Sequence, residues 1–149
     1  MGSAIPSVEI RRARRGDAAR IAVLSCQLGY PATTRQVAKR LSLVLQEYAS
    51  ACFVAETREE GVVGWVHVSS TPLLEVQRRA EVNGLVVEEK CRNHNIGWLL
   101  LEAAEKWADK LGCKSMSVRS NVIRDRAHVF YLRHGYEHYK TQKAFRKAL

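Results

Sequence analysis

Apolar residues recur along most of the chain at the two spacings that regular secondary structure requires. Alternating or continuous apolar runs predict strands at residues 8–12, 51–56, 62–70, 81–87, 115–120 and 136–145. The last segment, 136–145, is predicted to be either one strand or a pair of strands. Apolar residues at a helical period predict helices at residues 17–28, 33–48, 96–111 and 126–134. A charged turn that ends in Gly61 joins the second and third strands as a hairpin.

Residues with capping chemistry stand at the ends of these helices. Asp17 and Asp125 are predicted N-caps, and Thr33 with Gln36 has the form of a capping box. Gly112 follows the longest helix, as a C-terminal cap does. The order β-α-α-β-β-β-α-β-α-β, without repeat or linker, predicts one mixed α/β domain at residues 8–149. Residues 1–7 lack the apolar region of a signal peptide, so a signal peptide is not expected there, and a disordered lead-in is expected instead.

Composition and charge narrow the class of protein. The 149 residues are 46% hydrophobic, which is enough for one compact core, and no apolar run reaches the length of a membrane span. The four cysteines have no C-x-x-C spacing and no partner at ligand spacing. We therefore expect idle thiols in a reducing cytoplasm and no metal site. The net charge of +9 weakly favours an anionic ligand, and nucleic acid more weakly still.

The turn between the strand at 81–87 and the helix at 96–111 has the composition of a phosphate site. It contains Arg92, Asn93, His94, Asn95 and Gly97. A polar turn at a helix start presents backbone N–H groups, the positive end of the helix dipole and a nearby cation. The turn thus favours a nucleotide-like anionic cofactor. An ordinary link between a strand and a helix is the alternative.

The element order and this turn resemble the GNAT superfamily of acetyl-CoA-dependent N-acetyltransferases over nearly the whole chain. The family's pattern is Arg/Gln-x-x-Gly-x-Gly/Ala, after a Leu-x-Val strand and before Leu-Leu in the helix. This pattern is matched here by residues 85–87, Arg92, Gly97 and residues 99–100. The resemblance implies an α/β (α+β) fold with about four helices. Its mixed, mostly antiparallel sheet would be splayed between the fourth and fifth strands.

Asn95 departs from the pattern, because it stands where the family has its first glycine. That glycine serves a turn with positive φ, and asparagine is the other residue that best tolerates this conformation. Asparagine is also a preferred N-cap. We therefore expect Asn95 to keep the backbone path and to cap a helical N–H, while Gly97 leaves room for a pyrophosphate.

A second similarity lies at residues 121–136, where the family often has Asn, then Ala-x-x-Phe-Tyr, then Gly-Phe or Gly-Tyr. It implies that Asn121 binds the cofactor and that the helix with Phe130 packs beside it. It also implies that Tyr131 is the general acid that returns a proton to the CoA thiolate. The alternative for Tyr131 is a core aromatic with a hydrogen-bonded hydroxyl. The resemblance implies acetyl-CoA contacts by Leu85, Val86, Val87, Arg92, Asn93, His94, Asn95, Ile96, Gly97, Trp98, Asn121, Ala127 and Phe130.

Glu81 begins its strand within Ala-Glu-Val, which is similar to the Ala-Glu-Ile of some protein-acetylating members. There the glutamate is the general base, and an alkyl ammonium must lose a proton before it attacks a thioester. The alternative base is a water chain. Glu81 could also be an ordinary solvated carboxylate without a catalytic role, which is common at the start of a strand.

The implied reaction moves an acetyl group from acetyl-CoA to a primary amine by direct attack in a ternary complex. We expect a cytoplasmic monomer or homodimer, with neither nucleic acid nor membrane as a partner. The sequence does not identify the acceptor, a small-molecule or protein amine. The basic segments 26–48 and 137–149 disfavour polycations, unless Glu47, Glu56 and Glu75 gather into an acidic site. A non-catalytic acyl-CoA-binding module and, less favoured, a basic nucleic-acid-binding domain are the other functions considered.

Overall fold

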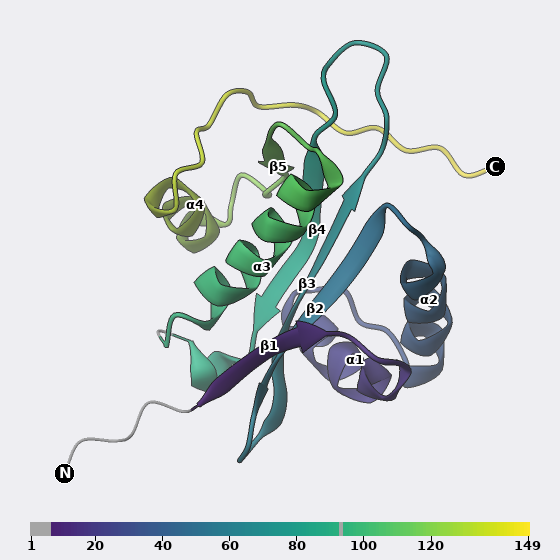
Figure 1. The fold of residues 1–149 in the computed structure, drawn as a ribbon, viewed down its shortest axis with the longest axis vertical. Coiled ribbons are helices and arrows are strands. Elements are labelled where there is room, and N and C mark those ends of the chain that lie inside the picture. Colours follow the sequence, from purple (N-terminus) through teal and green to yellow (C-terminus); the bar gives the residue numbers. More distant parts are fainter. Residues whose placement is uncertain (1–6, 93) are drawn as a thin grey trace. The chain divides into compact units, whose positions relative to one another are not determined.

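The computed structural model describes residues 7–92 and 94–149, which fall into two compact units that divide after Arg119. The described part of the first unit contains one sheet in the order β1-β2-β3-β4-β5 (Figure 1). Its first four strands are antiparallel, and β5 is parallel to β4. The strands are β1 (Val8–Arg12), β2 (Ser50–Thr57), β3 (Gly61–Ser70), β4 (Ala80–Val87) and β5 (Met116–Val118).

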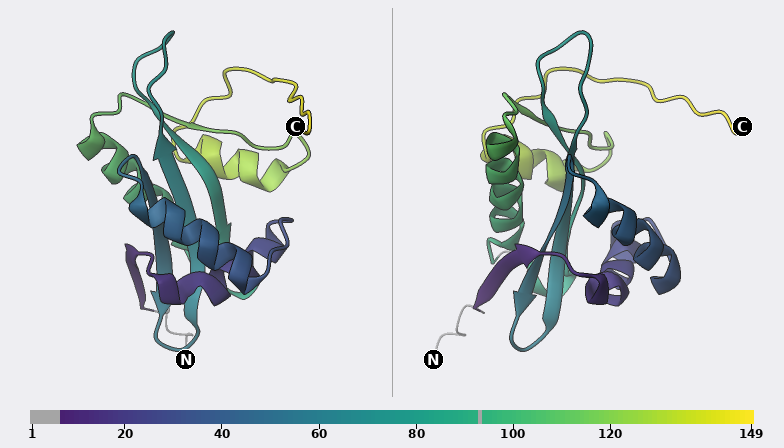
Figure 2. Two further views of the ribbon diagram at one scale, coloured as in Figure 1. Left: turned by 90° about the vertical axis from the view of Figure 1, so that its right-hand side faces the viewer. Right: turned by 45° about the vertical axis from the view of Figure 1, so that its right-hand side comes forward.

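Helices cover both faces of this sheet. The helices α1 (Ala18–Gln27) and α2 (Thr34–Gln46) lie on one face, and α3 (Ile96–Leu111) lies on the other (Figure 2). Alternating strand residues supply both cores, because successive side chains point to opposite faces. On the α1–α2 face, Leu24 and Leu41 join Cys52 and Val54 in one buried cluster.

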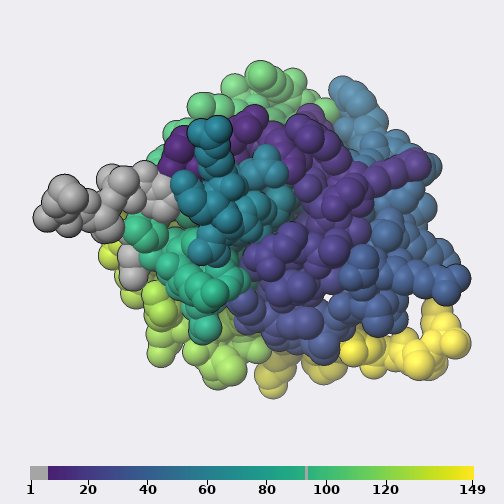
Figure 3. All heavy atoms as spheres, turned by 90° about the horizontal axis from the view of Figure 1, so that it is seen from below, coloured from purple at the N-terminus to yellow at the C-terminus, as the bar shows by residue number. Residues whose placement is uncertain are grey.

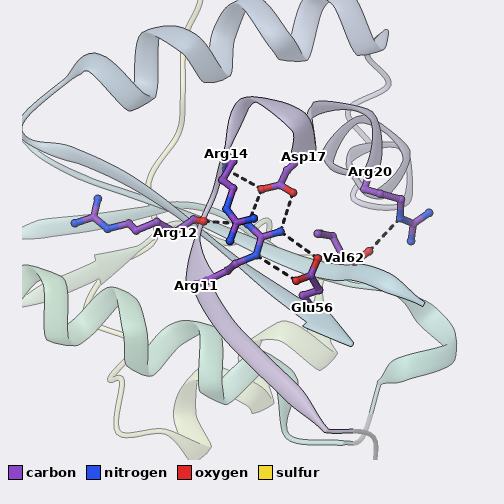
Figure 4. A network of polar contacts seen from close by, with 7 residues as sticks. All are labelled: Arg11, Arg12, Arg14, Asp17, Arg20, Glu56 and Val62. Carbon is purple, nitrogen blue, oxygen red and sulfur yellow. Dashed lines mark hydrogen bonds and ion pairs between the residues drawn. The ribbon is translucent and has the colours of Figure 1, made fainter. Parts of the chain in front are cut away.

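An ion-pair network connects the start of α1 with strands β1 and β2. The Arg11 guanidinium donates to both carboxylate oxygens of Asp17, at 2.9 and 3.0 Å, and to Glu56 on β2 (Figure 4). Asp17 also accepts the N–H of Arg14 at 2.7 Å. The predicted side-chain cap on α1 is therefore wrong: the Asp17 carboxylate is taken by Arg11 and by the 3-10 turn before α1, and it makes no capping bond to α1.

The end of α1 meets the end of β4. The Gln27 side chain donates to the Glu88 carboxylate and accepts the N–H of Glu89 at 3.3 Å. Seen from below, α1 lies beside the turn between β2 and β3 and beside the residues that follow β4 (Figure 3). The predicted capping box of α2 is confirmed, since Thr33 accepts the N–H of Gln36 and Gln36 accepts that of Thr33. Among the described residues, no helix combines the length and apolarity needed to cross a lipid bilayer.

The second unit contains the helix α4 (Asp125–Arg133). Arg124 is its N-cap, so Asp125 lies in the first turn instead of capping it, and Gly135 follows the helix with φ 91°. The strand predicted at 136–145 is wrong, because residues 136–149 form no regular structure. A strand needs a neighbour for its backbone groups, and within this unit the structure describes none. Residues 137–149 are exposed.

Candidate functional site

Half of β4 has an open edge. The strand β5 pairs only with its beginning, from Ala80 opposite Met116 to Val82 opposite Val118. In the described part of the first unit, residues 83–87 have a strand neighbour only on the β3 side. The expected divergence of the fourth and fifth strands is therefore confirmed.

The backbone groups at this edge point outward. A bulge makes Asn83 an extra residue, since Val82 and Gly84 pair with the consecutive residues Val68 and His67 of β3. Past the bulge, the Glu88 N–H bonds to the Val63 carbonyl of β3 at 2.7 Å. Because alternate residues of a strand direct their backbone groups to opposite sides, those of Leu85 and Val87 point away from β3. No strand of the described first unit pairs with them. The N–H and C=O of Leu85 and the N–H of Val87 are therefore open to an extended ligand, whereas the Val87 carbonyl already accepts a hydrogen bond from Arg92.

The predicted phosphate turn lies at the end of this open edge. Arg92 turns back so that its Nε donates to the Val87 carbonyl at 3.2 Å. Asn93 lies outside the described residues, and His94 and Asn95 are exposed. The backbone, a cation and a helix start are thus brought together after β4, as the sequence predicted.

Asn95 has φ 66°, and among the described residues it is the one non-glycine with positive φ. The predicted left-handed conformation is confirmed. The predicted side-chain cap is wrong, since Asn95 is the N-cap residue but its side chain makes no capping bond. The Leu99 N–H bonds to the Asn95 carbonyl at 3.1 Å, which is the i to i−4 bond that opens the helix. The N–H groups of Ile96 and Gly97 therefore have no acceptor within the helix. Ile96 is buried, and Gly97 and Trp98 are half-buried.

Glu81 lies at the other end of β4, where the pairing with β5 is still intact. It is opposite Ser69 of β3 and Ser117 of β5. Its carboxylate forms an ion pair with Arg119 at 3.2 Å, and its side chain is 32% exposed. Asn83, two residues later, donates to the Ser69 hydroxyl at 2.7 Å. Glu81 and Asn83 therefore share the sheet face that α1 and α2 cover.

A cavity of about 390 Å³ lies on this same face, between the two helices and strands β2, β3 and β4. We call it the α1–α2 cavity, and its lining includes Tyr30, Val37, Arg40, Trp65, His67 and Asn83. Within it, His67 Nε2 is 2.9 Å from the Ser50 hydroxyl, and burial lowers the pKa of His67. His67 is therefore neutral near pH 7. The cavity was not predicted, because the alternation of Trp65, His67 and Ser69 does not by itself say which face of the sheet these residues occupy.

The second unit brings the other predicted residues together along α4. Asn121 Oδ1 accepts the N–H of Ile123 at 3.2 Å, which makes its side chain part of the turn before the helix. Ala127 and Phe130 are half-buried. The Tyr131 ring packs edge-on against Phe130 and Tyr136, at centroid distances of 5.2 and 5.6 Å. Burial raises the pKa of Tyr131 to about 12, so the phenol is protonated at neutral pH.

These elements match a known family. The model of the acetyltransferase (GNAT) family matches residues 20–136. No curated protein matches the sequence.

Solved structures share the fold at low sequence identity. An aminoglycoside N-acetyltransferase in complex with CoA is 17% identical, with a TM-score of 0.86 over 97% of each chain. An aminoglycoside 6'-N-acetyltransferase from Acinetobacter baumannii is 16% identical, with a TM-score of 0.83 over 96% of this chain and 99% of that one. A transcriptional regulator from Bacillus halodurans C-125 is 21% identical, with a TM-score of 0.82 over 95% of this chain and 100% of that one.

Proposed function

Because the chain belongs to the GNAT family of acetyltransferases, we propose that it moves an acetyl group from acetyl-CoA to a primary amine by direct attack in a ternary complex. The observation that carries this proposal is the open edge of β4, which leads directly into the turn at Asn95 and the start of α3. The open edge of β4 can pair with an extended chain of amides, and the first N–H groups of α3 can bind a phosphate. These two sets of backbone groups follow one another directly along the chain.

The residues present fit acetyl-CoA along this path. The outward N–H and C=O groups of Leu85 and the N–H of Val87 would pair with the amides of the pantetheine, as an added strand would. The N–H groups of Ile96 and Gly97 are directed at the pyrophosphate, where the helix dipole also favours negative charge. Arg92, whose Nε is on the Val87 carbonyl, supplies a cation between the two parts.

Acetyl-CoA supplies an activated thioester, whose C–S bond breaks as the amine nitrogen forms the amide bond. Removing the proton from an alkyl ammonium of pKa about 10.4 costs about 4.6 kcal/mol at pH 7. Glu81, directly or through water, accepts this proton. Support for this role is its place on the sheet face that carries the α1–α2 cavity.

Tyr131 donates a proton to the departing thiolate. Its support is the motif at 121–136 together with a phenol that stays protonated at neutral pH. Asn121, Ala127 and Phe130 are proposed cofactor contacts on the same sequence grounds. The backbone of β4 and the turn at Asn95 contribute by positioning acetyl-CoA. Positioning is the larger part of catalysis when no covalent intermediate forms.

Calorimetry with acetyl-CoA tests the proposal first. We expect saturable binding that Arg92→Ala weakens, because this change removes the cation next to the edge of β4. Lys90→Ala is the matched control, since Lys90 is an exposed cation two residues earlier and is expected to leave affinity unchanged. Absence of binding at millimolar acetyl-CoA would overturn the proposal. An amine panel with thiol detection then tests transfer.

A further inference from the structure

The α1–α2 cavity opens onto the part of β4 where transfer would take place. Asn83, the extra residue of the bulge, lines the cavity, and it directly follows the last residue of β4 that pairs with β5. Two residues later, Leu85 begins the outward backbone groups assigned to acetyl-CoA. An amine held in the cavity would therefore lie next to the thioester. This argument rests on the proposed function.

The walls of the cavity are mainly apolar. Val37, Leu41 and Val44 of α2 face it, and Trp65 contributes an aromatic surface from β3. The indole packs against the backbone of Gly84, where a Cβ atom would come within 2.6 Å of the ring. A volume of about 390 Å³ is in the range of small-molecule sites. A compact aromatic or branched body fits this lining.

The cavity offers no negative charge to its ligand. Among the described lining residues none is a carboxylate, and Arg40 is a cation without an ion-pair partner in the described chain. His67 is neutral near pH 7, and burial raises the pKa of Cys52 to about 12, so the thiol is uncharged. Glu56, which the sequence left as part of an acidic site, is bound by Arg11. The further ammonium groups of a polycation, beyond the one that reacts near Glu81, would lose water in the cavity without gaining a partner.

Trp65 contributes carbon surface to the cavity wall. Its indole Nε1 is buried and forms no hydrogen bond with any residue that the structure describes, so it is not accessible to a ligand in the cavity. The ring therefore offers apolar contact area, which favours an apolar ligand body.

We propose that the α1–α2 cavity binds the acceptor, and that this acceptor is a monoamine with an aromatic or branched apolar body. Polycationic aminoglycosides are poor substrates, although two of the similar structures are aminoglycoside acetyltransferases. The difference lies in the charges lining the cavity, which a shared fold does not determine.

Three amines test this specificity: phenethylamine, ethylamine and kanamycin. With acetyl-CoA saturating, we expect kcat/KM for phenethylamine to exceed that for each of the other two by about tenfold or more. Trp65→Leu removes the aromatic surface and keeps the wall apolar. It is expected to lower kcat/KM for phenethylamine more than that for ethylamine.

Arg40→Glu tests the charge of the cavity. We expect the ratio of kcat/KM for kanamycin to that for phenethylamine to rise. Arg35→Glu, at an exposed position of α2 outside the cavity lining, makes the same change in net charge and is expected to leave this ratio as in the wild type.

The outcomes separate this inference from the proposed function. A preference for kanamycin, or acetylation of neither class by a protein that binds acetyl-CoA, would overturn the inference and leave cofactor binding intact. Equal effects of Arg40→Glu and Arg35→Glu would also contradict it. Failure to bind acetyl-CoA would overturn the proposed function, and with it the premise of this inference.

Discussion

Asn95 sets the backbone path at the single point where the open edge of β4 continues into α3. Its φ of 66° is a conformation that glycine adopts freely, that asparagine tolerates and that β-branched residues resist. The sequence alone predicted this conformation, because a glycine position of the family pattern is filled by the residue that best replaces it. The lost side-chain cap was not predictable, since a residue in the left-handed region aims its side chain differently from an extended N-cap.

Substitution of Asn95 tests whether this conformation serves binding. Asn95→Gly keeps the left-handed conformation available, and we expect acetyl-CoA affinity to be close to that of the wild type. Asn95→Val imposes a strain of about 1–2 kcal/mol, and we expect weaker binding or lower stability by a comparable amount. Calorimetry and urea unfolding measure the two effects. Equal behaviour of the glycine and valine variants would show that the backbone conformation is unimportant.

Glu81 is expected to matter most where the acceptor amine is protonated. Glu81→Gln should lower kcat at pH 7, and the loss should shrink as the pH approaches the amine's own pKa near about 10. Arg119→Ala breaks the ion pair but keeps the carboxylate, and Glu75→Gln changes an exposed glutamate outside the sheet. Both controls should retain the wild-type pH profile. A loss in Glu81→Gln that is the same at every pH would exclude the proton-accepting role.

Tyr131 is expected to affect the alkaline side of the pH profile. Burial raises its pKa to about 12, so the proton-donating form persists well above pH 10. Tyr131→Phe should lower kcat while acetyl-CoA affinity stays nearly unchanged, and wild-type activity should not decline through tyrosine ionisation near pH 10. Stopped-flow transfer assays between pH 7 and pH 11 measure both. Full activity of Tyr131→Phe across the amine panel would favour a non-catalytic acyl-CoA-binding module.

At the scale of elements, the sequence pattern predicted those features of helices that depend only on neighbouring residues. The capping box of α2, the apolar stripe of α3 and its terminal glycine all lie within short segments, so they can be found in sequence. The α1–α2 cavity could not, because it depends on which face Trp65 and His67 occupy. A shift of one residue in strand pairing reverses the face, and only the paired sheet determines it.

The contact between β1 and α1 is expected to be a pH-dependent source of stability. Burial alone would raise the pKa of Asp17, but hydrogen bonds from Arg11 and from the Arg14 N–H outweigh it and lower the pKa below its usual value. The stabilisation is therefore fully present above the unfolded pKa of about 3.9, and it is lost as the pH falls through the folded value.

Asp17→Asn should therefore destabilise the protein by about 1.5–3 kcal/mol at pH 7, since it removes charge-assisted hydrogen bonds. The difference from wild type should shrink in acid, as the pH falls below the usual carboxylate pKa and through the lowered pKa of Asp17. Urea unfolding at several pH values measures this, with Asp109→Asn at the exposed end of α3 as the control. A difference that persists undiminished in strong acid, where wild-type Asp17 is protonated, would contradict the ionic explanation.

At the scale of the whole molecule, the family was predictable but the arrangement of the proposed catalytic groups was not. The Arg92 turn and the motif at 121–136 are local patterns, so the sequence identified both. The structure places the first pattern on the edge of β4 and describes the second within a unit of its own. The failed strand at 136–145 has the same cause, because a strand is defined by its neighbours as much as by its own residues.

The open edge of β4 also has a consequence for solubility. An unpaired row of N–H and C=O groups is a template for another chain, and edges of this kind promote aggregation unless they are covered. Since acetyl-CoA would cover residues 85–87, we expect the ligand-free protein to scatter more light with rising concentration and acetyl-CoA to suppress the rise. Desulfo-CoA, which has no thioester to transfer, should act equally well. Identical scattering with and without ligand would show that the edge is already protected. If acetyl-CoA suppresses the scattering, its concentration controls how much of the protein stays in solution.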